Sequence, residues 1–133
     1  VWGRGVEYGE MKILISVEDI SLEAQLNESD TTRAIAAALP IDGKAHRWGK
    51  EIYFEIPVDA EQAPDAREKV AVGDIGYWPP GKAFCIFFGP TPASTDGKPR
   101  AASPVNVFGH ITGNPSVLDN VRDGAPVSVT SVD

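Results

Sequence analysis

The stretch at residues 73–89 constrains the fold of this chain more than any other, because it predicts a β-hairpin whose second strand is apolar on both faces. Pro80 fixes φ at about −65° and Gly81 can adopt a positive φ, as the two central residues of a type II turn require. This turn would join antiparallel strands at 75–78 and 83–88. Because side chains alternate along a strand, both faces of 83–88 need cover. One face can fill a core, and the other lies under another element or borders a groove that binds a ligand.

Composition predicts one soluble globular domain. The chain has 133 residues, 42% hydrophobic and 23% charged, which is ordinary globular usage. Its net charge of −7 opposes phosphate backbones and anionic lipids, so we expect neither a nucleic-acid nor a membrane partner. We find no apolar run of the roughly 20 residues that span a bilayer and no signal segment, and the expected location is cytoplasmic. Met11 directly precedes the first strand pattern, so we interpret residues 1–10 as an extension and 11–133 as the domain.

Periodicity predicts a mainly β fold with about eight strands and two short helices. The strands are expected at 12–17, 20–26, 45–48, 51–56, 75–78, 83–88, 105–111 and 125–132. The helices are expected at 30–39 and at 115–121, and segments 57–69 and 90–104 are expected to be loops. We expect a common interior for Ile13, Ile15, Leu22, Ile52, Phe54, Val107 and Val127. A closed antiparallel barrel capped by two helices fits this order, and an open two-layer sheet is the alternative.

Aromatic residues supply the candidate binding surface. Tyr53, Tyr77 and Trp78 have apolar bodies with polar tips, which suit either a groove wall or a barrel rim. Phe84 and Phe87 lie on opposite sides of one strand, so one of them should face the groove. The ligand expected from these five residues is a small apolar molecule or a proline-containing peptide, bound beside the loop at 90–104.

The ionisable residues predict little further chemistry. Cys85 is expected to be an inert buried thiol, because no basic residue lies near it in sequence. His46 and His110 lack the spacing of a metal motif, and we expect no metal and no cofactor. Glu51 and Glu55 would lie roughly 13 Å apart on one strand, too far for a catalytic pair, and are expected to form a solvated face.

Several motifs resemble known proteins. The segment Val107-Phe108-Gly109-His110-Ile111, with the helix and final strand after it, is similar to the corresponding part of cyclophilins. A closer resemblance is to a family of small prokaryotic proteins of unknown function with a cyclophilin-like fold. Three motifs carry it: Trp48-Gly49-x-Glu51-Ile52-Tyr53-Phe54, Gly73-Asp74-x-Gly76-Tyr77-Trp78-Pro79, and Phe87-Phe88-Gly89 with Thr91-Pro92. The resemblance covers 11–131 and implies a closed eight-stranded antiparallel β-barrel with two short helices.

The resemblance also implies a candidate activity. Cyclophilins are peptidyl-prolyl cis-trans isomerases, and segment 45–48 is similar to the stretch that carries their catalytic Arg, which makes Arg47 the candidate catalytic residue. The residues that build the cyclophilin proline pocket have no counterpart after Arg47. We therefore expect a binding module first and an isomerase second. A structural subunit that forms homo-oligomers through exposed aromatic residues is the third hypothesis.

Overall fold

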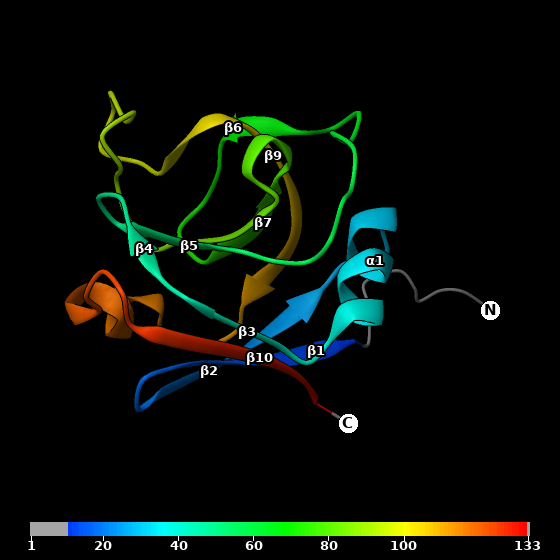
Figure 1. Ribbon diagram of the computed structural model, residues 1–133. Helices are drawn as coiled ribbons and strands as arrows, with labels where there is room; N and C mark the ends of the chain where they lie inside the picture. Colours follow the sequence, from blue (N-terminus) through cyan, green and yellow to red (C-terminus); the bar gives the residue numbers. More distant parts are fainter. Residues whose placement is uncertain (1–10, 133) are drawn as a thin grey trace.

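The computed structural model describes residues 11–132 and shows a mainly β protein with few helices (Figure 1). The expected extension at 1–10 lies outside the described residues. The strands of the described part of the protein are β1 (Lys12–Val17), β2 (Ile20–Leu26), β3 (Ile41–Lys44), β4 (His46–Arg47), β5 (Glu51–Glu55), β6 (Arg67–Lys69), β7 (Asp74–Trp78), β8 (Ala83–Phe87), β9 (Arg100–Ile111) and β10 (Pro126–Val132). Its helices are α1 (Asp30–Ala38) and the 3-10 helices η2 (Pro79–Gly81) and η3 (Pro115–Asn120).

The strands form one antiparallel sheet that folds over on itself. Within the described residues the sheet has ten strands in the order β3-β10-β1-β2-β9-β7-β8-β5-β4, with β6 paired to β9. The two end strands, β3 and β4, follow each other in the chain, but they pair with different neighbours. The change occurs at Ala45, whose N–H donates to the Ala125 carbonyl and whose carbonyl accepts the Gly124 N–H. The next residue, His46, pairs with Tyr53 of β5. The antiparallel β class is confirmed. The closed eight-stranded barrel is not, because the hydrogen-bonded order does not close and contains ten strands.

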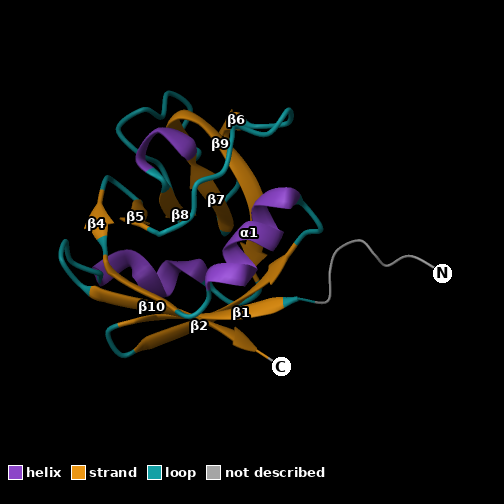
Figure 2. Ribbon diagram, turned by 45° about the vertical axis from the view of Figure 1, so that its right-hand side comes forward, coloured by secondary structure: helices purple, strands orange, loops and turns teal. Residues whose placement is uncertain are grey.

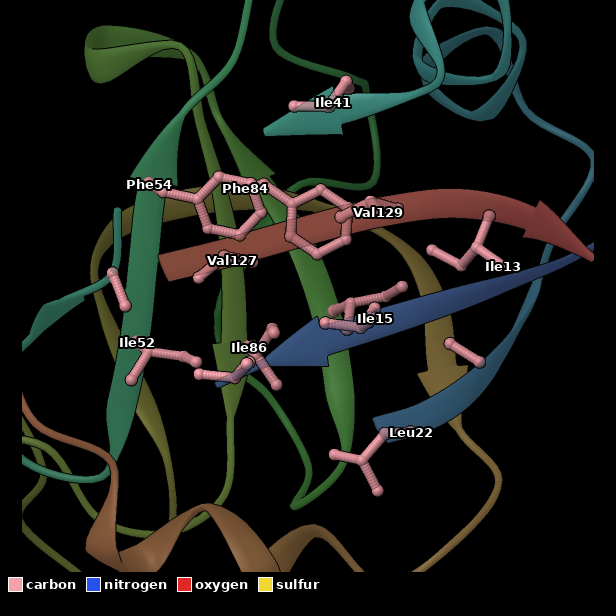
Figure 3. Close-up of a cluster of buried hydrophobic side chains, with 14 of the residues drawn as sticks. Ile13, Ile15, Leu22, Ile41, Ile52, Phe54, Phe84, Ile86, Val127 and Val129 are labelled. Carbon is pink, nitrogen blue, oxygen red and sulfur yellow. The ribbon is translucent and has the colours of Figure 1, made fainter. Parts of the chain in front are cut away.

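The main core lies between two layers of this folded sheet. Strands β1, β2 and β10 form the lower layer in Figures 1 and 2, and β5, β7 and β8 lie above it. Phe54 and Phe84 stack at 5.0 Å between ring centroids, facing the aliphatic side chains of β1 and β10 (Figure 3). The predicted common interior is confirmed for Ile13, Ile15, Leu22, Ile52, Phe54 and Val127. It is wrong for Val107, which is half-buried on the other side of the sheet.

The predicted hairpin is present, but its turn is different. Strands β7 and β8 pair from Ile75 with Ile86 to Trp78 with Ala83. The connection is the 3-10 helix η2, closed by the Lys82 N–H on the Pro79 carbonyl at 3.2 Å, and the positive φ of 49° falls on Lys82. The type II turn is therefore wrong. Two consecutive prolines fix φ values that suit a 3-10 turn over the expected residues 79–82, and the positive φ expected of Gly81 falls on Lys82 instead.

A second apolar cluster covers the other face of β8. It contains Ala83, Cys85 and Phe87 of β8 together with Ala101 and Val105 of β9. The first residues of β9 belong to the segment expected to be a loop at 90–104, and β6 lies in the expected loop at 57–69. Both expectations are wrong at these positions, because the two short polar segments form strands by pairing with each other.

Local capping signals place α1 and η3 where the two helices were expected. The Ser29 side chain accepts a hydrogen bond from the Thr32 N–H at the start of α1, and the helix ends before Pro40. Asn114 caps η3 in the same way. No helix in 11–132 is both long enough and apolar enough to cross a membrane.

Gly109 gives a test of this topology, because it pairs with Leu26 of β2 and with Ile75 of β7. A Cβ at Gly109 would lie 2.8 Å from the Gln25 carbonyl oxygen and 2.7 Å from a Leu26 methyl carbon. We predict that Gly109→Ala lowers the free energy of unfolding by about 1–3 kcal/mol in urea titrations. Gly113→Ala is the control, since its nearest neighbour would be 3.8 Å away. Equal stability of the two variants would contradict the arrangement.

Candidate ligand-binding pocket

A mostly apolar pocket opens on the side of β5 and β8 that faces away from the main core. Its volume is about 240 Å³. The lining residues come from the β4–β5 turn, β5, β7, β8 and β9, and are Trp48, Glu51, Tyr53, Trp78, Cys85, Ala101, Ala102 and Val105. Segments far apart in the sequence therefore build one concave site, which is the usual form of a small-molecule site.

Strand alternation explains why these side chains meet. In β5, Ile52 and Phe54 enter the main core, so Glu51 and Tyr53 project to the opposite side. Tyr53 pairs directly with Cys85 of β8, and residues opposite each other on paired strands share a face. The pairing of β5 with β8 therefore determines which side chains enter the main core and which form the floor of the pocket.

Hydrogen bonds hold the aromatic walls in place. The Trp78 indole donates to the Ser103 hydroxyl at 2.6 Å, which ties this ring to β9. Trp48 and Glu51 exchange backbone hydrogen bonds at 2.9 and 3.2 Å, so the tight turn between β4 and β5 brings both to the pocket. Tyr53 packs against the His46 ring at 5.3 Å between centroids. The walls are therefore largely formed before any ligand arrives.

Glu51 is the one carboxyl group among the described pocket residues, and it is buried. The residue is 5% exposed, and among the described residues it forms no ion pair with a Lys, Arg or His. Burial raises the pKa of Glu51 to about 7, and a hydrogen bond from Cys85 opposes part of this rise. The expected solvated face is thus correct for Glu55, which is exposed, and wrong for Glu51, because β9 covers this end of the sheet.

Cys85 lines the same pocket as this carboxyl group. Burial, followed by the nearby Glu51 charge, raises the pKa of the Cys85 thiol, so the sulfur keeps its proton. The Cys85 thiol donates a hydrogen bond to the Ala83 carbonyl oxygen at 3.8 Å. The inertness expected of Cys85 stays a prediction, whereas its place in the pocket was not foreseen.

The structure brings together some of the predicted binding residues and separates others. Tyr53 and Trp78 line the pocket. Tyr77 is fully buried, and its hydroxyl donates to the Val58 carbonyl at 2.6 Å. Phe84 lies in the main core and Phe87 in the second cluster, both without exposed surface. Trp48, Glu51 and the β9 residues were missed, because their role depends on long-range pairing.

Arg47 has a different set of contacts from those of a pocket residue. Its guanidinium donates to the carbonyls of Gly49, Asp119 and Val121 at 2.8, 2.7 and 2.9 Å. The same group lies 5.1 Å from the centre of the Phe88 ring. Arg47 therefore fastens the β4–β5 turn to η3, and it is absent from the residues that line the pocket.

A second, polar groove lies beside β9, and three of its ionisable side chains, those of Arg67, Asp74 and His110, already contact one another. Asp74 accepts the Ala71 N–H at 2.9 Å, lies 3.1 Å from His110 Nδ1 and is 4.0 Å from the Arg67 guanidinium. In the described part of the chain, no group of three His, Cys, Asp or Glu residues is arranged to hold a metal ion. The aromatic pocket is thus the better candidate site.

The buried carboxyl group gives a prediction for stability. The folded chain holds the Glu51 proton up to a pKa of about 7, against an ordinary value of 4.5, so stability should fall as pH rises between these values. The loss is on the order of 3 kcal/mol. We predict that Glu51→Gln is more stable than the native chain at pH 8 in urea titrations, with a flatter profile between pH 4.5 and 7. Glu55→Gln should keep the native profile, and an unchanged profile in Glu51→Gln would refute the assignment.

Comparison with known proteins agrees with this architecture. The family model described as Cyclophilin-like matches residues 11–130. The solution structure of the hypothetical protein AF2241 from Archaeoglobus fulgidus is 45% identical, with a TM-score of 0.80. The match covers 96% of this chain and 98% of that chain. No curated protein shows significant similarity. Because the family model spans nearly all described residues, the chain belongs to the cyclophilin-like family.

Proposed function

We propose that this chain binds a small, largely apolar molecule in the pocket on the outer side of β5 and β8. The observation that carries the proposal is the pocket itself, in which Trp48, Tyr53 and Trp78 surround a buried carboxyl group. Its volume of about 240 Å³ suits a small metabolite or a single side chain better than an extended peptide.

The fixed position of the walls supports this proposal. Aromatic rings offer a large contact area with few rotatable bonds, and the Trp78 ring is already held by Ser103.

An oligomer interface made of exposed aromatic residues has less support. The aromatic residues in 11–132 are buried or half-buried, and the exposed large hydrophobic residues there are Val72 and Val117. We therefore do not propose assembly through aromatic contacts.

Ligand binding can be tested by NMR titration with neutral aromatic probes such as indole and benzyl alcohol. We predict saturable shifts of the Trp48 and Trp78 indole signals. Ala102 is exposed at the pocket rim, so Ala102→Trp should block the pocket without crowding the core and should abolish these shifts. Ala37→Trp, at an exposed position on α1, is the control. Probe binding that survives Ala102→Trp would contradict the proposed site.

The isomerase hypothesis gives a separate prediction. We expect X-Pro peptides to relax at the uncatalysed rate, over tens to hundreds of seconds, in the presence of this protein. The reason is that the Arg47 guanidinium is bonded to three backbone carbonyls instead of facing the pocket. Arg47→Ala should lower the melting temperature, since these bonds join two segments. Acceleration that is lost in a folded Arg47→Ala variant would restore the isomerase hypothesis.

A further inference from the structure

The pocket contains a carboxyl group that forms no ion pair with any cation in residues 11–132. Glu51 lines the pocket, and only 5% of its surface is exposed to solvent. The nearby cations are engaged elsewhere. Lys50 pairs with Asp119 at 3.3 Å, Arg100 pairs with Glu68 at 2.8 Å, and Arg47 bonds backbone carbonyls. A buried carboxylate without a cation is costly, so its retention beside an open pocket indicates a partner that comes from outside.

The walls around Glu51 favour a positive partner as well. The faces of indole and phenol rings carry negative potential and attract organic cations, most strongly where water is excluded. Trp48, Tyr53 and Trp78 supply three such rings in one pocket. A carboxylate and several aromatic rings would together repel an anionic ligand. They would also bind a neutral ligand less strongly than a cation of the same shape.

We infer that the pocket binds a small organic ammonium ion, whose charge pairs with the Glu51 carboxylate while its apolar part lies among Trp48, Tyr53 and Trp78. This inference rests on the proposed function and adds the chemical class of the ligand. Cys85 lines the same pocket, and its thiol is occupied by a hydrogen bond to the Ala83 carbonyl oxygen at 3.8 Å.

Binding of a cation should be coupled to loss of a proton. The other titratable side chains that line the pocket among the described residues are Tyr53 and Cys85, and both are neutral when protonated. At neutral pH a fraction of Glu51 carries its proton, since burial raises its pKa to about 7. An ammonium ion that prefers the ionised carboxylate must therefore displace this proton. Its affinity should rise with pH below about 7 and level off above it.

The experiment compares matched probes that differ in charge. Benzylammonium and benzyl alcohol form one pair, and choline and its neutral carbon analogue form the second. Isothermal titration at several pH values, in buffers with different ionisation enthalpies, measures affinity and the protons released. We expect at least one ammonium probe to bind about tenfold more tightly than its neutral partner at pH 8, with proton release near pH 6.5. The neutral probes should show no pH dependence.

Two variants separate the charge from the pocket shape. Glu51→Gln should bind the neutral probes as before, lose the preference for ammonium and release no proton, whereas Glu55→Gln should behave like the native chain. Equal binding of charged and neutral probes, or a preference that survives Glu51→Gln, overturns the inference and leaves the proposed function standing. The inference also fails if only neutral probes bind. If no probe of either kind binds, the proposed function fails with it.

Discussion

The double burial of β8 is the constraint on which the rest of this structure depends. Phe84, Ile86 and Phe88 enter the main core, while Cys85 and Phe87 face the second cluster. A strand that is apolar on both sides must lie inside the sheet and beneath a further layer. The first half of β9, paired with β6, supplies that layer. The pocket lies where this cover leaves part of the outer face open, so fold and site have the same origin.

Glu51 shows how such a site can cost stability. The residue occupies a buried strand position where an apolar side chain would be better for the fold, and this burial is the main cause that raises its pKa to about 7. Perturbed ionisable groups gather at functional sites because binding or catalysis requires them there. The Glu51 carboxyl group, the Cys85 thiol and the aromatic rings of Trp48, Tyr53 and Trp78 line one pocket.

Local signals were enough to predict much of the fold. The hairpins of β1 with β2 and of β7 with β8, and the start and end of α1, depend on alternation and caps within a few residues. β3 and β6 were missed, because polar residues such as Asp42 and Lys69 hide their strand character until a partner is known. The site was predicted in part, through Tyr53 and Trp78. Glu51 could not be recognised, since alternation shows which face a residue occupies but not what covers that face.

The junction at Ala45 has a consequence for how copies of this protein meet. The sheet ends in two strands, β3 and β4, of four and two residues, and the chain runs directly from one into the other. Unpaired strand edges are templates for aggregation, and very short edges offer little backbone for another chain to extend. Because one bent segment forms both ends of the strand path, each of these two ends exposes only a short stretch of backbone to which another chain could add.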